Sequence, residues 1–283
     1  MSEIVEMVKY KLQRVRDLAT PRYMRWLLTQ RFRAGAMLTT RLNDGITIQY
    51  LPEGNVSRDL YLGQIEHDVV KFLAWYLKPG MVVMDLGANI GIHSLLSAKY
   101  VGEHGAVHAF EPTPRTFEQL RANVELNGFT CVQLNQLAVA DKSGTSTFYL
   151  YSQCGMNSMR RQDWVGKPLE QIVVETVSLD EYVQAKNLQR VDLLKIDVEG
   201  AELLVLKGAR SLLCRQNPPV VVCEFTNKTT RNFGYQAISL RNFLESLGYH
   251  LSRWNSESGC LVPEPRSSNY KIYANLVCIK RRG

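Results

Sequence analysis

The chain has 283 residues, of which 45% are hydrophobic and 22% are charged, with 19 glycines and 10 prolines. This composition excludes disordered, collagen-like and disulfide-rich proteins, and it is typical of a globular chain that buries a sizeable core. No apolar run reaches the roughly 18 to 20 residues that cross a bilayer, and the charge-interrupted start is unlike a signal peptide. We therefore expect a soluble, cytoplasmic protein.

The net charge of +7 is concentrated in two basic segments. Residues 1–35 carry eight Lys or Arg and three acidic residues, and residues 280–282 are all basic, whereas the remainder is nearly balanced. A balanced body offers no continuous basic track, so a nucleic-acid partner is disfavoured. Two interpretations of the basic N-terminus stay open: a solvated helical face, or contact with an acidic partner, an anionic substrate or a peripheral membrane surface.

The first 60 residues differ in pattern from the rest and predict a basic N-terminal extension, followed by a main domain at 61–283. Apolar residues at helical spacing over 5–15, and Thr20-Pro21 as a cap with proline at the first helical position, predict two helices. The strand-like run at 46–51, followed by turn residues, predicts a small hairpin that joins them to the body.

After a helix expected over 64–77, strands and helices alternate. The expected strands are MVVMDL, AVHAFE, CVQLNQLAVA, TSTFYLY, QIVVETV, VDLLKID, VVVCEF, GYHLSRW and YANLVCIK, with helices expected at 92–101, 114–127, 200–209 and 237–247 and a capped helix at SLDEYVQ. Continuously apolar strands in repeated βα units indicate an α/β fold with a doubly wound, mostly parallel sheet. Because no helix separates the last two strands, we expect them to form an antiparallel edge.

A glycine-containing turn, Asp85-Leu86-Gly87-Ala88-Asn89-Ile90-Gly91, joins MVVMDL to the helix at 92–101. Glycines there permit a tight turn and close approach to a ligand, and exposed N–H groups at the helix start suit a polar or anionic group. The spacing is not the GxGxxG of nicotinamide dehydrogenases, because Asn89 and Ile92 stand where its second and third glycines belong. A nicotinamide oxidoreductase stays open as a less favoured alternative.

Acidic residues end the following strands. Glu111 lies 24 residues after Gly87, where a carboxylate can accept hydrogen bonds from both hydroxyls of a ribose, and Pro112 rigidifies its turn. Asp197 ends VDLLKID, whose tip borders the same crevice in a doubly wound sheet. We therefore expect one binding site at this edge of the sheet.

Three further carboxylates belong to this region. Glu199 and Glu202 follow Asp197 at the start of the next expected helix, and Glu224 is near the end of VVVCEF. Capping of the helix N-terminus is an alternative explanation for Glu199 and Glu202.

The motifs DLGANIG, FEP, NVELNG, LAVAD, SLDEY and especially KIDVEGAE followed by LKGA resemble the FkbM family of S-adenosylmethionine-dependent methyltransferases. The resemblance covers about residues 80–225 and implies a seven-stranded Rossmann-like sheet and O-methylation of a sugar or polyketide-like hydroxyl. The cofactor-binding residues it implies are Asp85, Gly87, Ala88, Asn89 and Gly91 at the methionine end, Glu111 and Pro112 at the ribose, and Leu137 and Ala138 at the adenine.

Methyl transfer is an in-line displacement that requires the acceptor oxygen close to the methyl carbon. A carboxylate against the sulfonium would stabilise the starting state more than the transition state, so we expect acidic residues to act on the acceptor. Asp197, then Glu199, are the first candidates, and with Glu224 they could equally bind Mg²⁺. His93 is a candidate general base and His67 a further one, although such histidines are more often structural.

The segments 151–170 and 255–270, like residues 1–60, match nothing in the family and are expected to set acceptor specificity. In the first, Trp164 could stack on a sugar and Arg160 or Arg161 could meet a phosphate; a plain surface loop is the alternative. A non-enzymatic alternative for the whole chain is a methyltransferase-like scaffold that binds a partner or membrane through its basic arms.

Overall fold

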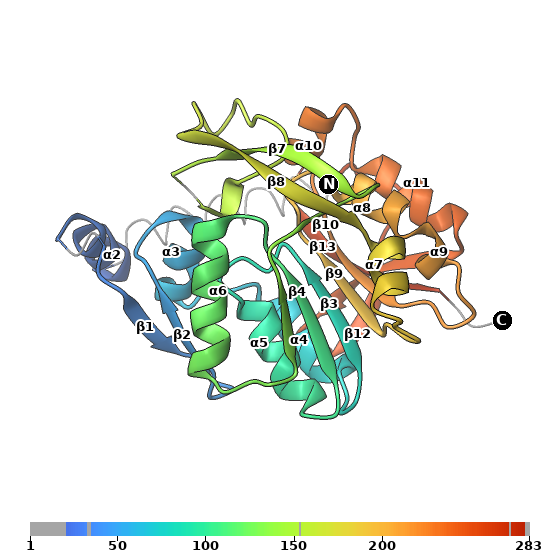
Figure 1. The fold of residues 1–283 in the computed structure, drawn as a ribbon, viewed down its shortest axis with the longest axis horizontal. Helices are drawn as coiled ribbons and strands as arrows, with labels where there is room; N and C mark the ends of the chain where they lie inside the picture. Colours follow the sequence, from blue (N-terminus) through green and yellow to red (C-terminus); the bar gives the residue numbers. More distant parts are fainter. Residues whose placement is uncertain (1–20, 33–34, 153, 272, 281–283) are drawn as a thin grey trace.

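The computed structural model describes residues 21–32, 35–152, 154–271 and 273–280. The helix predicted over 5–15 lies outside these residues. Helices cover both faces of a central sheet, as expected for an α/β fold (Figure 1). Within the described ranges, no helix is long and apolar enough to span a membrane.

The central sheet has eight strands in the order β12-β11-β13-β10-β9-β3-β4-β5. Their bounds are β3 Val82–Leu86, β4 Ala106–Phe110, β5 Val132–Asn135, β9 Leu193–Ile196, β10 Val220–Phe225, β11 Tyr249–Asn255, β12 Cys260–Pro263 and β13 Ala274–Lys280. Strands β5, β4, β3, β9 and β10 pair in parallel, whereas β13 runs antiparallel to both of its neighbours. The mostly parallel arrangement is confirmed.

Two details of the predicted sheet were wrong. It has eight strands rather than seven, because part of the segment 255–270 forms β12 and pairs antiparallel with β11. The last two expected strands, β11 and β13, pair antiparallel as predicted, but β13 lies between β10 and β11 and the edge strand is β12.

The run 131–140, predicted as one strand, is divided between two sheets. Its first part is β5, and its last part is β6 (Ala138–Ala140), which pairs in parallel with β8 (Glu170–Ser178). Strand β7 (Gly144–Leu150) completes this three-stranded sheet on the other side of β8. The two parts belong to different sheets because β5 pairs with β4 in the central sheet, whereas β6 pairs with β8.

The helices form two layers. The bounds are α2 Pro21–Phe32, α3 Gly54–Leu62, α4 His67–Tyr76, α5 Ile92–Val101, α6 Pro114–Leu126, α7 Leu179–Ala185, α8 Glu202–Gly208, α9 Arg210–Leu213, α10 Asn227–Thr230 and α11 Ile238–Ser246, with short 3₁₀ turns at Cys154–Met156 and Arg231–Phe233. Buried side chains of α7, α8, α9 and α11 form a core on one face of the sheet, and those of α4, α5 and α6 form two further clusters.

Local signals set several helix starts: Pro114 opens α6, and the Ser178 hydroxyl accepts the N–H of Glu181 at the start of α7.

The predicted hairpin is present as β1 (Leu38–Arg41) and β2 (Thr47–Tyr50), which pair antiparallel. Asn123 of α6 and Asn127, at the C-terminal end of that helix, hold the hairpin to the body. Asn123 exchanges hydrogen bonds of 2.7 and 2.9 Å with the Gln49 backbone, and Asn127 exchanges bonds of 2.9 and 2.7 Å with the Thr47 backbone. The boundary predicted at residue 60 falls inside α3 and stays a prediction.

Candidate active site

The candidate site lies at the carboxyl ends of four neighbouring strands, β4, β3, β9 and β10. Asp85 of β3 is directly paired with Lys195 of β9, Glu111 follows β4, and Asp197 follows β9. The sheet order therefore brings the predicted acidic strand ends side by side, at the edge where ligands bind in open α/β sheets.

The glycines of the turn are required by contacts inside the protein. Gly87 has φ +80°, and a Cβ there would lie 1.9 Å from the carbonyl oxygen of Asp197. Gly91 has φ +97°, and a Cβ there would lie 2.7 Å from Cδ1 of Leu120. Gly87 thus lets the β3 turn touch the backbone that follows β9, and this contact fixes the distance between two sides of the site.

The backbone N–H groups of the turn that precedes α5 donate within the protein, whereas the expectation for the N–H groups at the start of α5 itself stays a prediction. Those of Gly87 and Ala88 both donate to the carbonyl of Phe110, at 3.0 and 2.8 Å. Asn89, whose φ is +51°, donates its N–H to Glu111 Oε2 at 3.1 Å and accepts the N–H of Ile90 on its side chain. The N–H groups of this turn therefore bind the tip of β4 and the turn itself, rather than facing outward.

Glu111 connects two loops of the site. Glu111 is 6% exposed, and its carboxylate accepts the N–H groups of Asn89 and Thr113, at 3.1 and 2.9 Å. Burial raises the pKa of Glu111 to about 7, and those two N–H groups oppose the rise. Pro112 is buried beside it.

The segment predicted to contact adenine starts next to Glu111. The N–H of Glu111 donates to the carbonyl of Asn135 at the end of β5, two residues before Leu137. Leu137 is half-buried against the core, and Ala138 is buried in β6.

A buried lysine, which the sequence analysis did not single out, lies between two of the predicted acidic residues. Lys195 Nζ is 3.0 Å from Asp197 Oδ2 and 3.7 Å from Asp85 Oδ1. Asp85 is 1% exposed and also accepts the hydroxyl of Ser94 at 2.6 Å. Burial acts to lower the pKa of Lys195, but Asp197, Asp85 and Glu66 outweigh it and raise that pKa. Asp85 therefore contacts both β9, through Lys195, and α5, through Ser94, in the buried part of the site.

His93 faces a carboxylate that the sequence did not reveal. Its Nε2 lies 3.3 Å from Glu66 Oε2, without the angles of a hydrogen bond, while Asn275 Nδ2 donates to Glu66 Oε1 at 2.8 Å. Burial, and then the charge of Lys195, lower the pKa of His93 to about 4 despite Asp85 and Asp197. Burial, and then Asp197, raise the pKa of Glu66.

Glu66 precedes α4 and lies outside the motifs that carry the family resemblance, so only the fold brings it to the site. The neighbouring His67 is exposed, and its Nε2 contacts the Gly63 carbonyl at 3.1 Å instead.

The remaining carboxylates differ in role. Glu202 is 1% exposed and accepts the N–H of Gly200 at 2.9 Å, in the loop before α8, so the capping alternative stays a prediction. Burial, and then Asp197, raise the pKa of Glu199 and of Glu224. In the part of the chain that the structure describes, no three His, Cys, Asp or Glu side chains are grouped so that they could hold a metal ion.

The segment 151–170 lies against this cluster. Ser158 Oγ donates to the carbonyl of Glu199 at 2.9 Å, and the buried Gln162 side chain hydrogen-bonds the Glu199 side chain. The Lys228 ammonium lies 3.4 Å from the centre of the Trp164 ring and so covers one ring face. Arg161 pairs with Asp163 at 2.9 Å. The segment is thus fastened over Glu199 at both Ser158 and Gln162.

Comparisons with known proteins agree with the motifs. The model of the methyltransferase FkbM domain matches residues 85–251. The chain is 35% identical over 144 residues to "Methyltransferase 1" of Beauveria bassiana, covering 44% of this chain and 57% of that protein. It is 31% identical over 175 residues to the hexuronic acid methyltransferase AglP of Haloferax volcanii, and the match covers 62% of this chain and 68% of that protein.

A third relative is the 31-O-demethyl-FK506 methyltransferase FkbM of Streptomyces tacrolimicus, with 31% identity over 204 residues, covering 60% of this chain and 75% of that protein. The chain therefore spans between 57% and 75% of the length of these three relatives. The matched residues include the turn at Gly87, Glu111 and the KIDVEGAE segment. The chain belongs to the FkbM methyltransferase family.

Proposed function

We propose that this protein is an S-adenosylmethionine-dependent O-methyltransferase that acts on a hydroxyl of a small molecule or glycan. Family membership supports methyl transfer and argues against the nicotinamide oxidoreductase alternative. The names of two relatives, which refer to a hexuronic acid and to a 31-O-demethyl compound, support a sugar or polyketide-like acceptor. The observation that carries the proposal is that Glu111 and Asp197 follow β4 and β9, the two neighbours of β3, and that the Glu66–His93 pair lies close enough to Asp197 to feel its charge.

The residues at the tips of β3 and β4 fit an adenosyl cofactor. Each Glu111 oxygen already accepts one backbone N–H, which fixes the carboxylate and leaves lone pairs for the two hydroxyls of a ribose. The turn from Asp85 to Gly91 would hold the methionine end, and Leu137 and Ala138 the adenine. When bound, the cofactor supplies an electrophilic methyl group.

The acceptor hydroxyl must lose its proton during transfer, and we assign the proton acceptor to His93, whose ring lies beside Glu66. With a pKa of about 4, the His93 imidazole is neutral at pH 7 and can accept a proton. It is a weak base, but the hydroxyl becomes far more acidic as its oxygen bonds to carbon, so a weak base suffices late in the reaction. Asp197, paired with Lys195, would accept a hydrogen bond from the acceptor and orient it.

Two other arrangements remain as competing proposals. Glu199 could replace His93 as the base, and Asp197 with Glu224 could bind Mg²⁺ and so lower the pKa of the hydroxyl. Methylation that is lost with EDTA and restored by Mg²⁺ would favour the metal.

Cofactor binding is tested by calorimetric titration with S-adenosylhomocysteine. Replacing Glu111→Gln keeps the shape but removes the charge, and loss of charged hydrogen bonds worth about 1.5 to 3 kcal/mol should weaken binding roughly 10- to 100-fold. Glu118→Gln, an exposed residue on α6, is the control and should bind normally. Equal affinity of the two variants would contradict the cofactor assignment.

The base is tested with isotopically labelled S-adenosylmethionine and a panel of uronic acids and macrolides. His93→Gln should lower turnover by about 10²-fold or more while leaving S-adenosylhomocysteine binding intact. Glu66→Gln should have a smaller effect in the same direction. If Glu199→Gln abolished turnover and His93→Gln did not, the base would be Glu199. A protein that bound the cofactor but methylated nothing in the panel would favour the scaffold alternative.

A further inference from the structure

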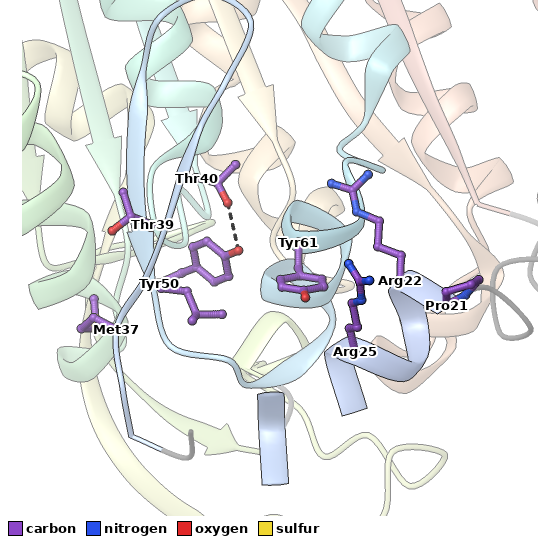
Figure 2. A pocket seen from close by; sticks show the side chains of 9 residues that line it. Pro21, Arg22, Arg25, Met37, Thr39, Thr40, Tyr50 and Tyr61 are labelled. Atoms are coloured by element: carbon purple, nitrogen blue, oxygen red, sulfur yellow. Dashed lines mark hydrogen bonds between the residues drawn. The ribbon is translucent and has the colours of Figure 1, made fainter. Parts of the chain in front are cut away.

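A polar cavity lies in the N-terminal part of the chain, outside the residues that match the family. It is an open cavity of about 730 Å³ that lies between α2, the β1–β2 hairpin and α3 (Figure 2). The lining residues that matter to its chemistry are Arg22, Arg25, Leu38, Thr40, Tyr50 and Tyr61. This volume is within the usual range of about 300 to 1,000 Å³ for small-molecule sites.

Two arginines give this cavity its charge. Arg22 and Arg25 are three residues apart on α2, so they project from the same side of the helix, and Figure 2 shows both directed toward Tyr61. Among the described residues, neither guanidinium forms an ion pair with a carboxylate. The cavity thus presents two positive charges that the described carboxylates do not neutralise.

Aromatic rings and hydroxyls form the other walls. The hydroxyls of Tyr50 and Thr40 are hydrogen-bonded at 3.0 Å, and the Tyr61 ring packs against the buried Trp26 at a centroid distance of 5.3 Å. These contacts connect the hairpin strands to each other and Tyr61 to α2, the helix that carries the arginines. Guanidinium groups form paired hydrogen bonds with phosphate oxygens, and hydroxyls can donate to the same group.

An adjoining cavity extends the first toward apolar groups. It has a volume of about 390 Å³, shares Arg25, Leu38 and Tyr61 with the first, and adds Leu28 and Thr29. Leu28 and Phe32 of α2 are 53% and 75% exposed. The arrangement suits a phosphate joined to a larger, partly apolar group.

We infer that this cavity binds a phosphate ester, at a site separate from the cofactor site. The phosphate contacts Arg22 and Arg25, and the remainder of the ligand lies along Tyr61 and Leu28. A soluble phosphorylated compound and a phospholipid headgroup present the same chemistry to the two arginines. The site gives the basic N-terminal extension a specific binding role in place of a merely solvated face.

The experiment uses the full chain with two probes, inorganic pyrophosphate in calorimetry and phosphatidylglycerol vesicles in sedimentation, with phosphatidylcholine vesicles as the neutral reference. Arg22→Gln and Arg25→Gln should each weaken binding at least tenfold. Arg31→Gln, which removes the same charge from the same helix but lines neither cavity, should bind like the unaltered protein. Binding of pyrophosphate identifies a soluble ligand, and binding of anionic vesicles alone identifies a lipid headgroup.

Either positive pattern supports the inference. It is overturned if the unaltered protein binds neither probe, or if Arg31→Gln weakens binding as much as Arg25→Gln, since the attraction would then be general. Binding of S-adenosylhomocysteine to the same samples shows that the variants are folded. If a glutamine variant does not fold, Arg25→Lys replaces it, because lysine keeps the charge but loses the paired hydrogen bonds. Arg25→Lys should also weaken binding of the probes. Unchanged binding by this variant would count against the site.

Discussion

The contact between Gly87 and Asp197 can be tested by adding a single methyl group. In Gly87→Ala, the new Cβ would lie 1.9 Å from the Asp197 carbonyl oxygen, so the two backbones must move apart by about 1 Å to reach the 3.0 Å below which such contacts essentially never occur. The left-handed φ of +80° costs about 1 to 2 kcal/mol with a side chain. The movement also strains the 3.0 Å hydrogen bond from Asp197 N–H to Leu86, worth about 1 kcal/mol, and the packing around it, worth about 1 to 3 kcal/mol.

We therefore expect Gly87→Ala to lower the free energy of unfolding by roughly 3 to 6 kcal/mol, measured by urea denaturation. Gly80→Ala is a matched control, because Gly80 has φ +84° and nothing within 4 Å of its would-be Cβ. It should show only the backbone effect of about 1 to 2 kcal/mol. If Gly87→Ala and Gly80→Ala lowered the free energy of unfolding by the same amount, the close contact between Gly87 and Asp197 would not constrain the site and the reasoning would be refuted.

Two further predictions concern buried charges. Lys195→Met should lower the free energy of unfolding, measured in urea, by about 3 to 5 kcal/mol, because it leaves the buried Asp85 without its partner. The control Lys207→Met removes an exposed lysine and should change the free energy of unfolding by less than about 0.5 kcal/mol. Similar losses in the two variants would contradict the buried pairing. Burial raises the pKa of Glu202 to about 7, so the folded state holds its proton more tightly and the group's contribution to stability is lost as pH rises from about 4.5 through 7. The free energy of unfolding of the unaltered protein should thus fall by about 3 kcal/mol over this interval relative to that of Glu202→Gln, with both measured in urea at a series of pH values. If the difference between the two proteins did not change with pH, the Glu202 carboxyl would ionise normally.

Much of the architecture was predictable because the signals were local. Apolar runs such as MVVMDL and VVVCEF gave the parallel strands, and SLDEY gave a helix with its cap. The positions of Glu111 and Asp197 could be predicted together, since parallel strands place their carboxyl ends at one edge.

What could not be predicted depends on contacts between distant residues. Glu66 reaches His93 only because α4 packs on α5, and no spacing in the sequence relates the two. Lys195 lies in an apolar run and becomes informative only through its register with Asp85. Strand β12 is short and mostly exposed, so its composition resembles a loop. The inward direction of the turn's N–H groups also depends on a partner, the carbonyl of Phe110, on another strand.

The position of β13 has a consequence for how the chain folds during synthesis. β10, α11 and β11 are made in succession, and parallel strands joined by a helix commonly become neighbours. Here β13 emerges later and must enter between them. Until it does, β10 and β11 each present a row of unsatisfied backbone groups that can recruit the wrong strand, either from each other or from another chain. In the finished sheet, residues 274–280 satisfy the facing backbone groups of both β10 and β11, so the correct topology is complete only when the last strand of the chain is in place.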